Sequence, residues 1–254
     1  MLAIISDIHA NVDALEAVLS DIDSQEITDV VCLGDVVGYG PTPMECVDLV
    51  MARCRFTVMG NHEEALLHGA YGFHLRAARA IDWTRDQLKP GFFSGQVVRK
   101  RWDYLSTLPL RHEAGPDLFI HGSPRQPTQE YLLGHEVGFG PTEKYEEVFA
   151  AFERLLFVGH THLPGVITDD YSWLPADGLE GGAYRVAGPG RRAVINVGSV
   201  GQPRDKDPRA CYAVVEGDEV RWRRVEYDVA RAQARFADIE ALDAMLAKRL
   251  GDGT

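Results

Sequence analysis

The sequence predicts an α/β protein that begins with a parallel sheet and continues into antiparallel strands. Up to residue 59, short apolar runs alternate with segments whose apolar residues recur every three or four positions. Continuous apolar runs are typical of strands buried on both faces, and the helices between them provide the crossovers that parallel strands require. Beyond residue 165, short runs joined by short turns are typical of antiparallel pairing instead.

Three strands and two helices are expected before residue 60. Their expected positions are 2–5, 30–33 and 55–59 for the strands, and 12–22 and 44–52 for the helices. Asn11 stands directly before the first helix, where an amide oxygen can accept a hydrogen bond from a free backbone N–H group. We therefore expect Asn11 to cap that helix.

The middle of the chain is expected to add a helical cover and two further strands. Residues 64–110 carry no site motif and are expected to cover one end of the sheet, with helices at 77–88 and 100–105. Strands at 118–120 and 155–158 and a helix at 143–154 are expected next. The loop at 125–142 is rich in Gly and Pro, and loops of this length in compact domains are often functional.

The last third of the chain is expected to form a second, antiparallel-rich sheet over residues 165–228 and a terminal helix at 229–250. The expected strands are 165–168, 183–187, 192–197, 210–216 and 220–228, with a hairpin turn at 216–219. No internal repeat, low-complexity tract or linker divides the sequence. We therefore expect a single domain over residues 1–254.

Composition and charge restrict the partners of the protein. The chain is 45% hydrophobic and 25% charged, which is ordinary for a soluble globular protein. A formal net charge of −12 argues against nucleic-acid binding through a broad basic surface. Bound divalent cations would reverse the sign of the field inside a site, so a small phosphorylated substrate is compatible with this charge. We expect such a substrate and no membrane partner, and the oligomeric state stays open.

Cysteine usage and the first residues of the chain favour a cytoplasmic protein. The four cysteines have no C-x-x-C spacing, and Cys32 and Cys211 lie in apolar runs, as is typical of buried free thiols in a reducing compartment. The chain reaches Ser6 and Asp7 at once, without the basic and long apolar segments of a signal peptide. No apolar stretch has the length of a membrane span.

Side chains of metal-binding types follow each of the predicted strands up to residue 158. They are Asp7, His9, Asp35, Asn61, His62, His121, His160 and His162. One such residue is more often structural, for example as a helix cap. The carboxyl ends of strands are, however, where open α/β sheets bind ligands. Because such residues follow every one of these strands, one shared site is favoured over separate structural roles.

The residue types of this set favour first-row transition metals such as Mn, Fe, Co or Zn, because imidazole and carboxylate ligands suit these ions. Asp7 and His9 are alternate residues, which point the same way in an extended chain and can converge on one ion. His160 and His162 would do the same in an extended chain, but would face different ions if the chain turns there. Two ions about 3.5–4 Å apart need a negatively charged bridge, and Asp35 is the natural candidate.

Five motifs carry a resemblance to a known family. They are Asp7-Ile8-His9, Gly34-Asp35, Gly60-Asn61-His62-Glu63, His121-Gly122 and Gly159-His160-Thr161-His162. In this order they resemble the signature of the calcineurin-like metallophosphoesterases. The run from Asn196 to Arg204 resembles the small bacterial and archaeal branch of that family, whose members suggest a dinucleoside polyphosphate as one guess at the substrate.

The resemblance implies a fold and a mechanism. The fold would be two mixed β-sheets packed as a sandwich, flanked by helices, with the site at the strand ends. One divalent metal would be held by Asp7, His9, Asp35 and His162, and the other by Asp35, Asn61, His121 and His160. A hydroxide bridging the metals would attack phosphorus, and His62 would contact the phosphate and protonate the leaving group. The metals would be Mn, Fe, Co, Ni or Zn, with Mn expected to support activity.

One departure from the family narrows the substrate. Members that dephosphorylate proteins carry Asp-Arg-Gly after the Gly-Asp motif, whereas this chain continues Val36-Val37-Gly38-Tyr39-Gly40. Small phosphoesters, phosphodiesters or nucleotides are therefore better candidates, with monoesterase and diesterase activity both open.

Several residues and two other functions stay open. Tyr39 and Arg204 are candidates for substrate binding, although Tyr39 could simply pack against Pro41 and Arg204 could be a solvated loop residue. His68 and His74 could reach the site, but a surface role is favoured for both. A non-catalytic scaffold of the same fold, or a nuclease, are the alternatives to an enzyme acting on small phosphoesters.

Overall fold

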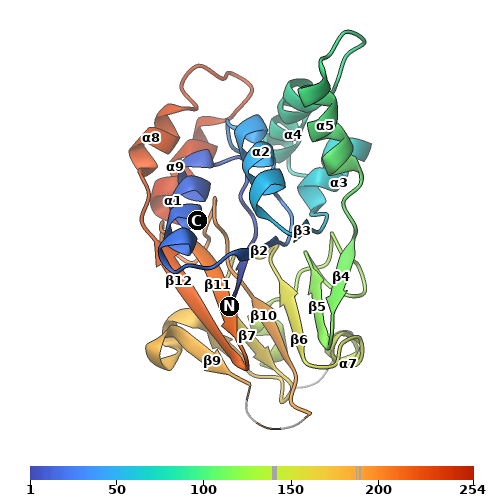
Figure 1. Ribbon diagram of the computed structural model, residues 1–254, viewed down its shortest axis with the longest axis vertical. Coiled ribbons are helices and arrows are strands. Elements are labelled where there is room, and N and C mark those ends of the chain that lie inside the picture. Colours follow the sequence, from blue (N-terminus) through green and yellow to red (C-terminus); the bar gives the residue numbers. More distant parts are fainter. Residues whose placement is uncertain (139–141, 187, 189) are drawn as a thin grey trace.

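Two six-stranded sheets pack face to face, with helices on their outer faces, in a computed structural model that describes residues 1–138, 142–186, 188 and 190–254 (Figure 1). Sheet A has the order β3 (Phe56–Thr57), β2 (Asp29–Cys32), β1 (Leu2–Ile5), β11 (Ala210–Glu216), β12 (Glu219–Val225), β9 (Ala183–Arg185). Sheet B has the order β4 (Arg111–Ala114), β5 (Asp117–Ile120), β6 (Leu155–Val158), β10 (Ala193–Asn196), β7 (Gly165–Thr168), β8 (Trp173–Pro175). Each sheet holds three parallel neighbours and is completed by antiparallel strands.

Alternate residues of each buried strand face different layers. In sheet A, Ile4 and Val31 point toward sheet B and pack in one core with Phe157. Their neighbours Ile5 and Cys32 pack instead against the helices on the outer face. Because side chains alternate across a strand, an apolar run in a central strand supplies both layers at once.

The helices lie on the outer faces of the two sheets and in a separate cluster. The helices are α1 (Val12–Ser24), α2 (Pro43–Arg53), α3 (Asn61–His68), α4 (Leu75–Leu88), α5 (Gln96–Ser106), α6 (Gly134–Val137), α7 (Glu143–Ala150), α8 (Val229–Ala234) and α9 (Ala244–Asp252), with 3-10 turns at Ala176–Gly178 and Glu180–Gly182. Helices α1 and α2 cover the outer face of sheet A, and α7 covers that of sheet B. Figure 1 shows α3, α4 and α5 together at the upper right, where the helical cover was expected. None of the helices in the described residues has the length and hydropathy that spanning a membrane requires.

Several local predictions are confirmed. The side chain of Asn11 caps α1 by accepting a hydrogen bond from the backbone N–H of Ala14 at 3.2 Å. The hairpin turn follows β11, whose last residue Glu216 pairs with Glu219 of β12. The sequence patterns did not predict β4, β8 and α6, each of which has four residues or fewer. Part of the 125–142 loop, residues 139–141, and residue 187 of the strand expected at 183–187 lie outside the described residues.

The prediction that residues 165–228 form one second sheet is wrong. Strands β7, β8 and β10 belong to sheet B, whereas β9, β11 and β12 belong to sheet A. Strand β1 is the last of the three parallel strands in sheet A. Strand β11 pairs antiparallel with its outer edge, with Leu2 opposite Val215. Pattern and turn length predict that a segment is a strand, but the partner depends on which edge of the preceding sheet is free.

The prediction of one terminal helix at 229–250 is also wrong, because α8 and α9 are separate helices. Asp243 begins α9 by accepting a hydrogen bond from the backbone N–H of Met245 at 2.8 Å. Leu242, Leu246 and Leu250 nevertheless pack in the same core as Phe236, which follows α8. The apolar spacing therefore continues across the break, and it gave no sign of the interruption.

Candidate metal centre

The strand ends that carry the predicted site residues meet at one edge of the sandwich. Asp7 and His9 follow β1, Asp35 follows β2, and His121 follows β5. Asn61 and His62 begin α3 just after β3, and His160 and His162 follow β6. All eight side chains belong to buried residues, and Asn61 is the most exposed of them at 8%.

The chain turns sharply at these residues. Five of the eight have positive φ angles, namely Asp7 (54°), His9 (49°), Asp35 (51°), His160 (65°) and His162 (61°). Such angles are uncommon outside glycine and gather at functional sites, because the surrounding structure must hold them. The expectation that Asp7 and His9 converge through extended backbone is therefore wrong in its premise, although both side chains do reach one group.

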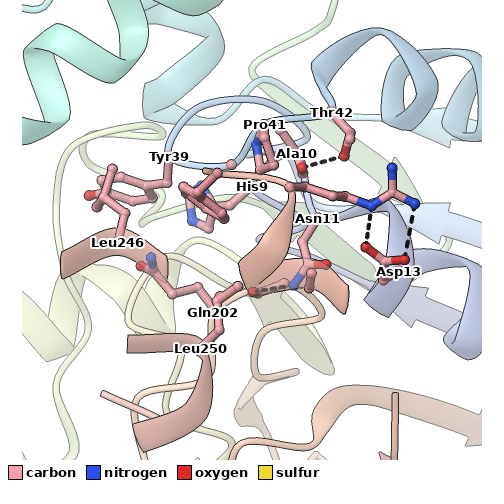
Figure 2. A pocket seen from close by; sticks show the side chains of 15 residues that line it. His9, Ala10, Asn11, Asp13, Tyr39, Pro41, Thr42, Gln202, Leu246 and Leu250 are labelled. Atoms are coloured by element: carbon pink, nitrogen blue, oxygen red, sulfur yellow. Dashed lines mark hydrogen bonds and ion pairs between the residues drawn. The ribbon is translucent and has the colours of Figure 1, made fainter. Parts of the chain in front are cut away.

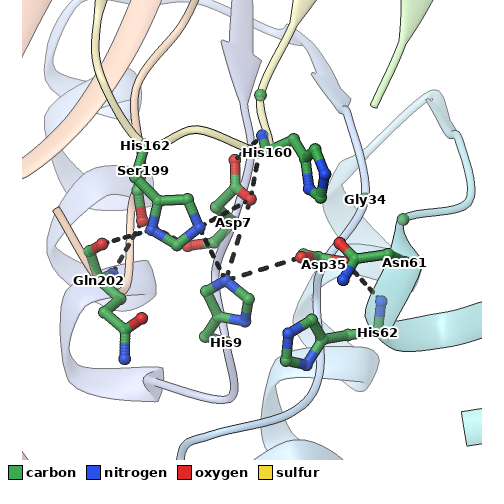
Figure 3. Close-up of polar contacts among 12 residues, drawn as sticks. Asp7, His9, Gly34, Asp35, Asn61, His62, His160, His162, Ser199 and Gln202 are labelled. Atoms are coloured by element: carbon green, nitrogen blue, oxygen red, sulfur yellow. Dashed lines mark hydrogen bonds and ion pairs between the residues drawn. The ribbon is translucent and has the colours of Figure 1, made fainter. Parts of the chain in front are cut away.

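The first ligand group consists of Asp7, His9 and His162 (Figure 3). The Nε2 atoms of the two histidines lie 3.1 Å apart. The Oδ1 atom of Asp7 lies 3.2 Å from Nε2 of His162 and 3.9 Å from Nε2 of His9. Three potential ligand atoms thus surround one small volume.

The second ligand group consists of Asp35, His121 and His160. Nε2 of His121 lies 3.0 Å from Nδ1 of His160 and 3.4 Å from Oδ2 of Asp35. The side-chain oxygen of Asn61 lies 3.0 Å from the same Nε2 atom of His121. The turn after β6 thus directs His160 and His162 into different groups, which was one of the two open alternatives.

Asp35 lies between the two groups. Its Oδ2 atom is 3.4 Å from Nε2 of His121 in the second group and 3.7 Å from Nε2 of His9 in the first. Its other oxygen accepts a hydrogen bond from the backbone N–H of His62 at 2.9 Å. The Asp35 carboxylate is thereby fixed where it reaches both sides of the site.

Backbone carbonyls orient the four imidazoles of the two groups. One nitrogen of each ring contacts a backbone carbonyl: Nδ1 of His121 with Leu33 at 2.8 Å, Nδ1 of His162 with Gln202 at 2.5 Å, Nε2 of His160 with Gln129 at 3.3 Å, and Nδ1 of His9 with Val37 at 3.4 Å. A carbonyl only accepts, so this nitrogen carries a proton in each ring. In the first group, the facing nitrogens of His9 and His162 then carry lone pairs 3.1 Å apart, which a bound cation would stabilise. In the second group, the effect of burial is outweighed by Asp35, which raises the pKa of His121 to about 9, so its Nε2 also carries a proton in the metal-free protein and donates to Nδ1 of His160 at 3.0 Å. Carbonyl contacts of this kind also orient metal-binding histidines.

The two carboxylates are ionised despite their burial. Burial opposes ionisation of Asp7, but the neighbouring His162 more than compensates and brings the pKa of Asp7 below its usual range. Asp35 is likewise buried, and its pKa is lowered chiefly by His121. The two carboxylates are therefore already in the form that binds a metal, whereas His121, whose pKa is raised to about 9, would release its second proton on binding one.

His62 lies beside the first group in a ring-lined space. Its ring centroid is 4.7 Å from that of His9, 4.4 Å from that of Tyr39 and 5.2 Å from that of Phe73. Its Nδ1 atom is buried and has no hydrogen-bond partner within the described part of the chain. Burial lowers the pKa of His62 to about 4, so the imidazole is neutral at pH 7 in the free protein.

Glu63 supports the site, and the sequence motif did not reveal how. One carboxylate oxygen accepts hydrogen bonds from the backbone N–H groups of Asp35 at 2.8 Å and Gly60 at 3.0 Å, and the other from Val37 at 3.1 Å. Burial and the nearby Asp35 raise the pKa of Glu63 to about 7. This fully buried side chain therefore ties the loop after β2 to the start of α3.

The run after β10 supports the site from the other side. Asn196 donates to the carbonyl of Gly159 at 2.7 Å, next to His160. Ser199 donates to the carbonyl of Asp7 at 2.8 Å, and the carbonyl of Gln202 holds His162 (Figure 3). The run that resembled the small branch of the family thus packs under the first ligand group.

Of the weaker candidates, Tyr39 and Arg204 lie at the site. The Tyr39 ring is 4.7 Å from that of His9. Burial and then the positive charge of Arg204 lower the pKa of His162, so the guanidinium lies near the ligands. Arg204 donates to the Oε1 atom of Gln202 at 3.1 Å, and its Nε is buried with no partner among the residues that the structure describes.

His68 and His74 belong to neither ligand group, although His74 lines a cleft together with Asn61 and His160 of the second group. His68 is exposed at the end of α3. His74 caps α4, where its Nδ1 accepts a 3.4 Å hydrogen bond from the backbone N–H of Arg76. The 125–142 loop, in contrast, does reach the site, because it supplies the Gln129 carbonyl and Tyr131, whose ring stacks on His160 at 3.8 Å.

A small cavity behind His9 is too tight for a substrate. The residues that line it include His9, Tyr39 and Gln202 as well as Leu246 and Leu250 of α9, all labelled in Figure 2. Its volume is about 10 Å³. This is close to the minimum that holds one water molecule.

Comparison with known proteins agrees with this geometry. Residues 1–219 match the family described as the calcineurin-like phosphoesterase superfamily domain. A metallophosphoesterase from Sphaerobacter thermophilus is 38% identical, with a TM-score of 0.82 over 100% of this chain and 98% of that one. An uncharacterized protein of Methanocaldococcus jannaschii is 35% identical over 245 residues, which cover 93% of this chain and 91% of that protein.

The fold is also shared with a hypothetical protein from Pyrococcus horikoshii, which is 20% identical with a TM-score of 0.75 over 100% of this chain and 98% of that one. The predicted sandwich of two mixed sheets flanked by helices is confirmed. Together, the family match and the buried groups of metal-binding side chains support a metal-dependent hydrolase that acts on phosphoesters. The chain belongs to the calcineurin-like phosphoesterase superfamily.

Proposed function

We propose that the protein is a dinuclear phosphohydrolase that cleaves a small phosphoester, phosphodiester or nucleotide. The observation that carries the proposal is the position of Asp35 between two buried groups of potential ligand atoms. A single-ion site would need only one such group. Two groups that share one carboxylate match the arrangement of two-metal phosphoryl-transfer sites.

The residues that would hold the ions divide between the two groups. The first ion would be held by Asp7, His9, His162 and Asp35, and the second by Asp35, Asn61, His121 and His160. Mn, Fe, Co, Ni and Zn suit this mixture of nitrogen and oxygen ligands, and Mn is the ion we expect to support activity. When bound, such ions would neutralise phosphoryl charge and lower the pKa of bound water.

His62 would contact the phosphate and hold the proton for the leaving group. Its neutral imidazole lies beside the first group, and the hydrogen bond from its backbone N–H to Asp35 fixes its position. A bound phosphate would place negative charge next to the ring and raise its pKa. The protonated form would then be available to donate to the departing oxygen.

Tyr39 and Arg204 would position the substrate. Arg204 brings a positive charge to the edge of the site, and the neighbouring Tyr39 ring stands beside His62. An arginine there would bind a phosphoryl oxygen through charge-assisted hydrogen bonds. Because the whole chain has a formal net charge of −12, the protein would attract a small anionic ester only at this cation-bearing site, and we propose that it works in the cytoplasm on such an ester.

The test is hydrolysis by chelator-stripped protein with and without each of the five metals. The substrates are p-nitrophenyl phosphate, its bis ester and diadenosine tetraphosphate, with elemental analysis of the loaded protein in parallel. Metal-dependent turnover with about two ions per chain would support the proposal, and the preferred substrate would separate monoesterase from diesterase activity. Bound metal with no turnover would favour the scaffold, and cleavage of DNA at comparable rates would favour the nuclease.

A further inference from the structure

A cleft of about 290 Å³ opens directly beside the second ligand group. Asn61 and His160 line it at the end nearest the candidate metals. Its walls come from three segments that are distant in the sequence: Tyr39 after β2, the 71–77 segment before and within α4, and the loop carrying Gln129 and Tyr131. A group bound in this cleft would therefore be attached to, or adjacent to, the phosphorus that the site holds.

The walls of the cleft are unusually rich in aromatic rings. Tyr39, Tyr71, Phe73 and Tyr131 all line it. The Tyr131 ring stacks on His160 at 3.8 Å with an interplanar angle of 15°, and the Phe73 ring meets His62 edge-on at 5.2 Å and 84°. Two of the rings are thus positioned by residues of the site itself, one on each side.

The rings remain open to a ligand. Tyr71 is 86% exposed and Tyr131 is 42% exposed. Large side chains exposed this far commonly mark a binding surface when they gather around one opening. Among the described residues that line the cleft there is no Asp, Glu, Lys or Arg, so it offers stacking surfaces and no formal charge.

We propose that this cleft binds the planar aromatic group of the substrate, and that the substrate is therefore a nucleotide-type phosphoester whose base lies between the 71–77 segment and Tyr131. The inference rests on the proposed function, because the phosphate of the same molecule must lie at the metal centre. Bases stack on aromatic side chains with little dependence on sequence, since every base has a π-face. Phe73 and Tyr131 would supply the affinity for the base, while the ligand groups hold the phosphate.

The test compares esters that differ only in the base. Adenosine 5′-monophosphate and ribose 5-phosphate both release a primary alcohol at the 5′ carbon of a ribose, and their methyl phosphodiesters provide the matched pair if the enzyme is a diesterase. Hydrolysis is followed by phosphorus NMR with metal-loaded protein. We expect kcat/KM to be about 10–100-fold higher for the adenosine ester, as loss of a stacked base typically costs.

Variants of residues that line the cleft test whether the difference in kcat/KM between the two esters arises there. Tyr71→Ala should reduce the preference for the base and leave ribose 5-phosphate hydrolysis within about two-fold. Phe73→Ala and Tyr131→Ala should each remove most of the preference, measured as the ratio of kcat/KM for the two esters, because these rings also contact His62 and His160 and both rates can change. The conservative variants Phe73→Tyr and Tyr131→Phe should retain the preference for the base. Phe92→Ala is the matched control, because Phe92 is an equally large apolar ring, 89% exposed, that does not line the cleft. Equal kcat/KM for the two esters, or equal loss for both in the alanine variants, would overturn the inference.

A binding measurement separates this inference from the proposed function. Calorimetric titration of the metal-loaded protein with adenosine, which has no phosphate, reports the cleft alone. Binding that is lost in Phe73→Ala and Tyr131→Ala supports the cleft even if no ester is hydrolysed, in which case the proposed function fails and the base site stands. Hydrolysis of both esters without adenosine binding up to millimolar concentration would retain the proposed function and refute the base site.

Discussion

Gly38→Ala should destabilise the protein by forcing His62 out of place. Gly38 has a φ angle of +85°, and a Cβ atom there would lie 2.0 Å from Nδ1 of His62. The ring cannot move freely, because it packs against His9, Tyr39 and Phe73. A left-handed alanine costs about 1–2 kcal/mol, and overpacking a filled site adds about 1–3 kcal/mol. The free energy of unfolding should therefore fall by about 2–5 kcal/mol.

Gly115→Ala provides the matched control, measured with Gly38→Ala by urea denaturation of metal-free protein. Gly115 also has a left-handed φ angle, +62°, but a Cβ atom there would meet nothing within 4 Å. This variant should lose only the conformational part, about 1–2 kcal/mol. The excess loss in Gly38→Ala then measures the clash with His62.

A double-mutant cycle identifies the partner in the clash. In a His62→Ala background the ring is absent, so Gly38→Ala should cost no more than Gly115→Ala. Displacing His62 should also lower kcat by about 10²–10⁴-fold, the usual contribution of a general acid. If Gly38→Ala is no less stable than Gly115→Ala and retains full turnover, the reasoning about a clamped His62 is refuted.

Four other changes test the site. His62→Ala should keep its metal content by elemental analysis but lose about 10²–10⁴-fold in kcat, and a fully active variant would remove His62 from the mechanism. Asp35→Asn should lower the metal content to one ion or fewer, because an amide carries no charge to share between two cations; two ions per chain would contradict the bridging role. Glu63→Gln should reduce the free energy of unfolding by about 2 kcal/mol, since its amide group would face the backbone N–H of Val37 as donor against donor, and a loss under 0.5 kcal/mol would contradict this. Chelation should lower the melting temperature, because metal at 100 times its Kd adds about 2.7 kcal/mol to the folded state, and an unchanged melting temperature would mean that no metal is bound to the folded protein.

The ligands could be predicted from the sequence because each follows a buried strand. A run such as residues 30–33 marks its own end by the change from apolar residues to Gly34 and Asp35, and parallel strands end at one edge. The geometry of the turns could not be predicted. The sequence around His160 and His162 does not distinguish an extended backbone from one with positive φ angles. This difference in backbone conformation decides which ligand group each histidine joins.

The pairing of strands that are distant in the sequence could not be predicted either. The runs that became β10 and β11 both predict strands, yet they lie in different sheets. Their separation depends on contacts with β6 and β1, which are distant in the chain and leave no trace in local periodicity. The role of Glu63 was hidden for the same reason, since its partners Asp35 and Val37 are backbone groups of another loop.

The C-terminal helices help to position a residue beside the candidate metal centre. Helices α8 and α9 follow the 1–219 region that matches the family, and their core includes the ring of Tyr39, which stands beside His62. Figure 1 shows them beside α1, on the opposite side of the molecule from α3 and α5. Leu246 and Leu250 line the small cavity behind His9 and Tyr39, so a substitution at either would change the packing of Tyr39 without replacing a candidate metal ligand. If Tyr39 positions the substrate, as proposed, substitutions in these helices would change the preference for an ester while every candidate metal ligand is kept.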